Sequence, residues 1–194
     1  MPNPRRSRRP RPLYLGKTLA GVVLLILDIL GVLVVFRHLA HFSWHAATPL
    51  AFVTGAGIYL VMHLLLWKPI FMHVMGHELT HAFWAFLLGG RIKSLQVSEA
   101  GGQVTLSKSN FLIALAPYFF PLYTFLLLPV YFIAVDKFRP VIAFLLGFTL
   151  AFHMALTLHS LKDRQSDMHE TGIFFSLTFV FYMNLLVVVL ILSV

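Results

Sequence analysis

Long runs of apolar residues separated by short polar segments dominate the chain. A helix needs about 20 apolar residues to cross a bilayer, and six runs come near that length. They lie at about 18–36, 49–67, 69–89, 111–135, 140–160 and 172–194. The pattern predicts an all-α polytopic membrane protein with about six transmembrane helices, packed as a single domain over residues 18–194.

One segment between the apolar runs lacks helical character. Residues 90–109 read GRIKSLQVSEAGGQVTLSKS, in which two short β-prone runs, Ile92–Val97 and Gln103–Leu106, flank the Gly-bearing turn EAGG. Alternating runs around a glycine turn favour a β-hairpin. We therefore predict a short hairpin directly after the third apolar run, with a plain surface loop as the alternative.

Composition supports a membrane protein and restricts its chemistry. Of 194 residues, 59% are hydrophobic and 11% are charged, and the mean hydropathy is +0.84. Soluble domains carry about 25% charged residues. The chain has no cysteine, so disulfides and cysteine-ligated zinc are excluded, and any metal must be bound by His, Asp or Glu.

Basic residues are concentrated before the first apolar run. Of the fifteen Lys and Arg residues, six lie there: Arg5, Arg6, Arg8, Arg9, Arg11 and Lys17. Because this arm adjoins a membrane span, the positive-inside rule predicts a cytoplasmic N-terminus and attraction to anionic lipid rather than to nucleic acid. Residues 1–12 contain four prolines, so residues 1–17 are predicted to be a disordered arm before an uncleaved anchor helix.

The third apolar run carries the pattern H-E-x-x-H as His77, Glu78 and His81. Helical residues four apart leave the same face, so both imidazoles can bind one zinc ion, with Glu78 beside the site as general base. Ionisable residues are costly in an apolar helix and usually mark function there. Hydrogen bonding of these side chains across helices is the alternative.

Other polar residues inside apolar runs have open roles. His73 lies one turn before His77 and suits either helix packing or the orientation of a ligand. Asp28 interrupts the first run and is predicted to face the bundle interior or a wet cavity, and Asn184 to hydrogen-bond between helices.

Hydrolytic zinc usually has three protein ligands, and few acids are available for the third. They are Asp28, Glu99, Asp136, Asp163, Asp167 and Glu170. Asp136 lies beside Lys137 and Arg139 and is predicted to be solvated, and Glu99 is predicted at the hairpin tip. Asp28 and the polar cluster at residues 159–172 remain.

Five segments together resemble the site-2-protease type of intramembrane zinc metallopeptidase, within its small bacterial branch that has little beyond the membrane core. They are HELTHAF (77–83), LGGRIKSL (88–95), GGQVT (101–105), LIALAPYFFP (112–121) and QSDMHETG (165–172). The resemblance implies zinc, a bacterial cytoplasmic membrane, and a third ligand from an aspartate in an N-P-D-G or L-D-G context. This chain lacks that tripeptide, and position favours Asp167, with Asp163 as its main rival.

The expected function is therefore that of an intramembrane zinc endopeptidase cutting membrane protein substrates in or near their transmembrane segments. The resemblance implies an extended substrate, which an edge strand of residues 92–106 could hold by β-augmentation. Two alternatives stay open: a catalytically silent member of the fold that acts as a membrane binding or regulatory protein, and a metal or proton transporter. The intact H-E-x-x-H favours the enzyme.

Overall fold

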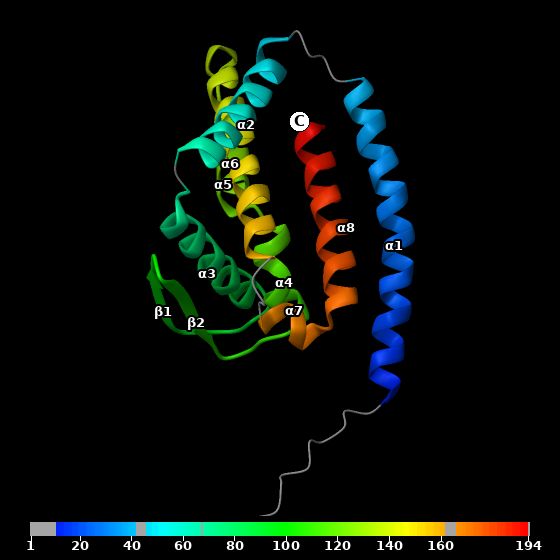
Figure 1. Ribbon diagram of the computed structural model, residues 1–194. Coiled ribbons are helices and arrows are strands. Elements are labelled where there is room, and N and C mark those ends of the chain that lie inside the picture. Colours follow the sequence, from blue (N-terminus) through cyan, green and yellow to red (C-terminus); the bar gives the residue numbers. More distant parts are fainter. Residues whose placement is uncertain (1–10, 42–45, 67, 162–165, 194) are drawn as a thin grey trace, which may run out of the picture.

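The computed structural model of the protein describes residues 11–41, 46–66, 68–161 and 166–193 (Figure 1). In chain order the elements are α1 (Arg11–Ala40), α2 (Ala47–Leu65), α3 (Ile70–Leu87), β1 (Ile92–Ser98), β2 (Gly101–Leu106), α4 (Phe111–Phe119), α5 (Leu122–Ile133), a 3-10 turn (Asp136–Phe138), α6 (Arg139–Ser160), α7 (Ser166–Thr171) and α8 (Ile173–Leu192). The predicted helical architecture with one hairpin after the third apolar run is confirmed.

The predicted count of six membrane spans is not confirmed. Within the described ranges, four helices are long and apolar enough to cross a membrane, namely α1, α2, α6 and α8, and the bent pair α4–α5 makes a fifth if it is one span. α3 is not among them, because three histidines and a glutamate lower the hydropathy of its 18 residues. These apolar helices fit an integral membrane protein.

A proline breaks the fourth predicted span. α4 and α5 are bent by 67° relative to each other, and the bend lies at Phe120, whose backbone is extended (φ −104°, ψ 97°). Pro121 follows directly, and a proline disfavours helical backbone in the residue before it. It also supplies no N–H to continue the helix. One apolar run therefore forms two short helices instead of one long one.

Glycines bring α2 and α6 into close contact. A Cβ atom on Gly55 would lie 2.0 Å from the carbonyl oxygen of Phe144, and one on Gly147 would lie 1.9 Å from that of Phe52. Small residues at such crossings let two membrane helices approach backbone to backbone. Nearby, the fully buried Tyr59 packs edge-on against aromatic rings of α6.

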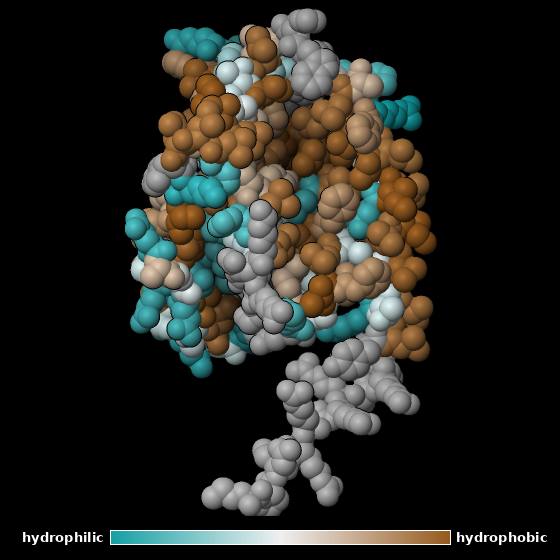
Figure 2. Space-filling view, in the orientation of Figure 1, coloured by the Kyte–Doolittle hydropathy of each residue, from teal (hydrophilic) through white to brown (hydrophobic). Residues whose placement is uncertain are grey.

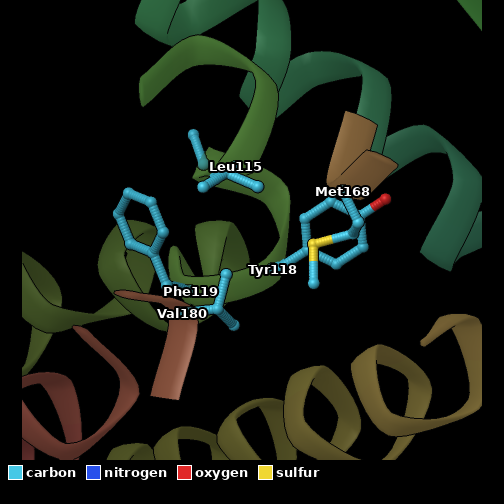
Figure 3. Packing of buried hydrophobic residues seen from close by; sticks show 6 residues of the cluster. Leu115, Tyr118, Phe119, Met168 and Val180 are labelled. Carbon is cyan, nitrogen blue, oxygen red and sulfur yellow. The ribbon is translucent and has the colours of Figure 1, made fainter. Parts of the chain in front are cut away.

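A second core lies around α4 and joins it to α7 and α8 (Figure 3). Its buried members are Leu115, Ala116, Tyr118, Phe119, Met168 and Val180. A hydrogen bond reinforces the contact with α8, because the Asn184 side-chain amide donates to the carbonyl of Tyr118 at 2.8 Å. The predicted interhelical role of Asn184 is confirmed.

α1 lies on the outside of the bundle beside α8 (Figure 1). Gly21 accommodates the ring of Phe174, and Gly31 accommodates Leu185. Lys17, at the start of α1, donates to the carbonyl of Thr171 at 2.6 Å. Residues 11–17 of the predicted basic arm belong to this helix, while residues 1–10 lie outside the described part. Much of the bundle surface in view is apolar, as expected in lipid (Figure 2).

The hairpin is antiparallel, with Leu95 opposite Val104 and Ser98 opposite Gly101, and it has one irregularity near its start. Its side chains are mostly exposed. The sheet packs against α3 (Figure 1). The hairpin is thus attached to the helix that carries H-E-x-x-H.

Candidate metal centre

α3 begins after Pro69 and ends in a glycine cap. Gly89 adopts φ +74°, a conformation that favours glycine and commonly closes a helix. The Gly90 N–H then donates to the carbonyl of Ala85 at 2.7 Å. This cap turns the chain from α3 into β1 and fixes where the hairpin starts relative to H-E-x-x-H.

The structure places the two imidazoles of H-E-x-x-H side by side. The ring centroids of His77 and His81 lie 4.9 Å apart, with the planes at 77°. This proximity follows from their i, i+4 spacing, which puts both Cβ atoms on one helix face. His77 also packs edge-on against the ring of Tyr118 from α4, at 5.3 Å.

A hydrogen bond from α4 sets the orientation of His81. Its Nδ1 lies 2.8 Å from the carbonyl oxygen of Ile113, and because a carbonyl can only accept, Nδ1 carries the proton. The lone pair is then on Nε2, the nitrogen through which His81 would bind a metal. Metal-binding histidines usually donate their other ring N–H in this way, to a carbonyl or carboxylate.

The Ile113 carbonyl is available because of a proline. In a regular helix the N–H of residue 117 would donate to the carbonyl of residue 113, but Pro117 has no N–H. Asn110 holds the same turn in place as the N-cap of α4, since its Oδ1 accepts from the Ile113 N–H at 2.9 Å. Asn110 and Pro117 were missed as supports of the site, although the asparagine before an apolar run and the proline spacing are both visible in the sequence.

Glu78 lies under the hairpin. Glu78 is 8% exposed, and Gly102 of β2 lies directly against it. A Cβ atom on Gly102 would lie 2.6 Å from Cγ and 3.0 Å from Oε1 of Glu78, and 2.7 Å from Cγ1 of Val74. A side chain at position 102 would therefore compete with the carboxylate for space. Gly102 was also missed from the sequence, because nothing local reveals this approach.

His73 forms a hydrogen bond with α6. Its Nε2 lies 2.8 Å from the Ser160 hydroxyl at the end of α6, and its ring centroid is 6.1 Å from that of His77. Of the two roles left open for His73, this contact favours helix packing between α3 and α6.

The third ligand remains a prediction. Asp167 lies in α7, but its side chain is outside what the structure describes, and Asp163 lies outside the described residues altogether. Met168, the neighbour of Asp167, packs in the cluster with Tyr118 (Figure 3), and Tyr118 contacts His77. Among the side chains that are described, no three of His, Asp and Glu are close enough together to hold a metal ion.

Three other acids lie elsewhere. Asp136 forms an exposed ion pair with Arg139 at 3.2 Å, consistent with a surface position outside the site. Glu99 is exposed in the turn between β1 and β2. Asp28 lines a cavity between α1, α6 and α8.

The donor set suits zinc. Imidazole nitrogens are common zinc ligands, and the proton on Nδ1 of His81 puts the lone pair on Nε2, as metal binding through that nitrogen requires. Residues 50–194 match the family model described as Peptidase M50B-like. The chain belongs to this family, which is of the site-2-protease type. No curated protein and no solved structure matches the chain.

Membership of the M50B-like family confirms the resemblance found in the sequence. M50 peptidases are metallopeptidases and are in general zinc-dependent, so the family supports a membrane metallopeptidase of the site-2-protease type. The match takes in H-E-x-x-H, the hairpin and α4 to α8, together with most of α2. All of α1 lies outside it.

Proposed function

We propose that this protein is an intramembrane zinc endopeptidase that hydrolyses peptide bonds in or near transmembrane segments of other membrane proteins. The observation that carries the proposal is the pair His77 and His81, with His81 held by the Ile113 carbonyl, beside the buried Glu78. Asp167 is the proposed third ligand. The protein is proposed to lie in the bacterial cytoplasmic membrane with its N-terminus in the cytoplasm.

The roles of the chain's own residues follow from their positions. Zinc bound here would act as a Lewis acid that polarises a carbonyl group and lowers the pKa of water. His77 and His81 provide two nitrogen ligands, and the Ile113 carbonyl keeps the His81 ring in its binding tautomer. Glu78 takes a proton from the attacking water at a carboxylate oxygen and gives it to the leaving amine.

The hairpin suits the presentation of substrate. A helical peptide hides its backbone, whereas an extended segment can pair with a strand edge. Because Gly102 touches Glu78, a segment paired with the hairpin near this point would have its backbone close to the proposed general base. The glycine lets the strand approach without a side chain between substrate and carboxylate.

The proline break suits the approach of water. A small cavity of about 20 Å³ lies between α3, α6 and the α4–α5 break, lined by Thr80, Pro117, Pro121 and His153 among others. This is room for about one water molecule. Irregular backbone at membrane depth is tolerated where it lines such a space.

The test is a paired measurement on the purified protein and its Glu78→Gln variant, with Glu99→Gln as the matched control. Zinc content and cleavage of candidate membrane substrates are measured for each. We expect Glu78→Gln to keep zinc and lose cleavage, because Glu78 is not a ligand, and Glu99→Gln to keep both, because Glu99 is exposed on the hairpin turn.

Full cleavage by Glu78→Gln would refute the mechanism. The chain has no aspartate-glycine pair. A second candidate function therefore stays open, that of a catalytically silent membrane binding protein. A wild-type protein that neither binds zinc nor cleaves any substrate would support that candidate instead.

A further inference from the structure

A cavity of about 640 Å³ lies between two pairs of helices. α2 packs against α6, and α1 packs against α8 (Figure 1). The pairs meet deeper in the bundle, in a buried cluster of Leu150, Val187 and Ile191. The cavity opens at the end of the bundle where α1 and α8 finish and α2 begins. Its volume is typical of a small-molecule site, so the packing leaves room for a ligand there.

The lining of this cavity is polar at the helix ends and apolar further inside. Its polar side chains lie at the end of α1, at the start of α2 and just after α8, and they include Arg37, His38, His41, Thr48 and Ser193. Ala143 and Leu146 of α6 line its inner part and are each 3% exposed. From the start of α6 at Arg139 to Leu146 the helix rises about 10 Å. The lining therefore fits an amphiphile with a polar head at the helix ends and an apolar tail directed into the bundle.

Arg37 indicates the charge of that head. The two histidines beside it are engaged by their own helix, because Nδ1 of His38 lies 3.2 Å from the Val34 carbonyl oxygen and Nδ1 of His41 lies 2.8 Å from that of Arg37. The Arg37 side chain is exposed, and within the described part of the chain it forms no ion pair. A guanidinium group offers five N–H donors in a geometry that matches phosphate. Arg37 therefore favours an anionic head group.

The start of α2 reinforces this preference. Its N-cap residue, Ala46, offers no side-chain acceptor to the N–H groups of the first turn, and Thr48 in that turn lines the cavity. Unpaired N–H groups and the helix dipole favour an anion near a helix start. The first turn of α2 and Arg37 thus favour the same charge.

The surroundings of the cavity indicate a lipid as the source of the anion. Phe36, next to Arg37, is 64% exposed, and Leu50, next to Pro49 of the lining, is 54% exposed. Exposed apolar side chains of this kind face acyl chains in a membrane protein. A soluble anion would leave the apolar inner part of the cavity unfilled, whereas a phospholipid brings both a phosphate and an acyl chain. Basic pockets between membrane helices are known to bind anionic head groups.

We propose that this cavity binds one anionic phospholipid, with its phosphate at Arg37 and the first part of an acyl chain against Phe52 and Leu146. The bound lipid bridges the two helix pairs at the end where their own side chains leave a gap. Arg37 precedes residues 50–194, which match the family model, so the family match does not account for this site. The proposal is also independent of the proposed protease activity.

The test measures which lipids contact α8 in nanodiscs made from equal amounts of phosphatidylglycerol and phosphatidylcholine. In the full-length protein a benzophenone amino acid replaces Leu192, which lines the cavity. The matched control carries it at Leu190, which is on the same helix, is 48% exposed and lies outside the cavity lining. After irradiation, mass spectrometry of the intact protein gives the ratio of phosphatidylglycerol adducts to phosphatidylcholine adducts at each position.

We expect this ratio to be about fivefold higher at position 192 than at position 190, equivalent to about 1 kcal/mol for one basic residue. Arg37→Gln should lower the ratio at position 192 to that at position 190, while Arg37→Lys, which keeps the charge, should retain the enrichment. Arg91→Gln removes an exposed positive charge outside the cavity lining and should leave the enrichment unchanged.

Equal ratios at positions 192 and 190 would overturn the proposal. This comparison needs no substitution of Arg37, so it holds even if Arg37→Gln does not fold. An enrichment that survives in Arg37→Gln would also overturn the proposal, because the charge of Arg37 would then not select the lipid. A cavity that holds a soluble anion instead would give equal lipid ratios at the two positions.

Discussion

Replacing Gly102 with alanine tests whether the hairpin positions Glu78. The new Cβ would lie 2.6 Å from Glu78 Cγ and 2.7 Å from Val74 Cγ1, whereas ordinary contacts are 3.4–4 Å. Val74 is β-branched and stiff within a helix, so it yields little. Either the hairpin retreats or the Glu78 side chain turns away, in both cases by about 1 Å.

A displacement of this size is large for catalysis. Misplacing a reacting group by about 1 Å can cost about 100-fold in rate, equivalent to about 2.7 kcal/mol of transition-state stabilisation. The three atoms nearest the new methyl group belong to Glu78 and Val74, neither of which is a proposed zinc ligand. Gly102→Ala should therefore lower kcat/KM about 100-fold while zinc content stays at the wild-type level.

The assay combines metal analysis of the purified protein with kcat/KM for one membrane substrate. Gly57→Ala is the control, because a Cβ there has nothing within 4 Å, and it should cleave as the wild type does. If Gly102→Ala keeps kcat/KM within about threefold of the wild type, the hairpin does not position Glu78. Loss of zinc in this variant would refute the proposal that Glu78 and its contact with the hairpin play no part in zinc binding by His77 and His81.

Three further outcomes are expected. Pro117→Ala restores an N–H that competes with His81 for the Ile113 carbonyl, so zinc affinity measured by chelator competition should fall about tenfold; unchanged affinity would show that the carbonyl serves both donors. Asp167→Ala should lose zinc in metal analysis while Asp163→Ala retains it, and the reverse result would exchange the two residues. Gly147→Ala adds a Cβ 1.9 Å from a carbonyl oxygen of α2 and should lower the free energy of unfolding by about 1–3 kcal/mol in denaturation in detergent, with Gly57→Ala unaffected.

Local patterns were enough to predict most of the helices and the hairpin. Apolar runs of membrane length located α1, α2, α6 and α8 to within a few residues at most of their ends, and a Gly-bearing turn between β-prone runs located β1 and β2. The count of six spans is not confirmed at two of the runs. The histidines and the glutamate of α3 lower its hydropathy, and the run at 111–135 is bent. Residues 111–135 form two helices that meet at Pro121, and the length of an apolar run does not reveal where a proline interrupts the helix.

Only part of the candidate site, likewise, could be predicted from local patterns. The pairing of His77 and His81 is a property of one helix and follows from spacing. The bond from His81 to Ile113 spans 32 residues, and the approach of Gly102 to Glu78 depends on how the hairpin folds back on α3. Such contacts are set by tertiary packing, which no local periodicity encodes.

The packing of α1 on α8 has a consequence for how the protein is made. About 130 residues separate the end of α1 from the start of α8, so at a synthesis rate of 5–20 residues per second α1 waits on the order of ten seconds for its partner. During that time Asp28 lacks the wall that α8 provides. An ionisable group facing lipid is costly, so we expect the insertion machinery to shelter this carboxyl group, and deleting α8 should leave α1 exposed to membrane quality control.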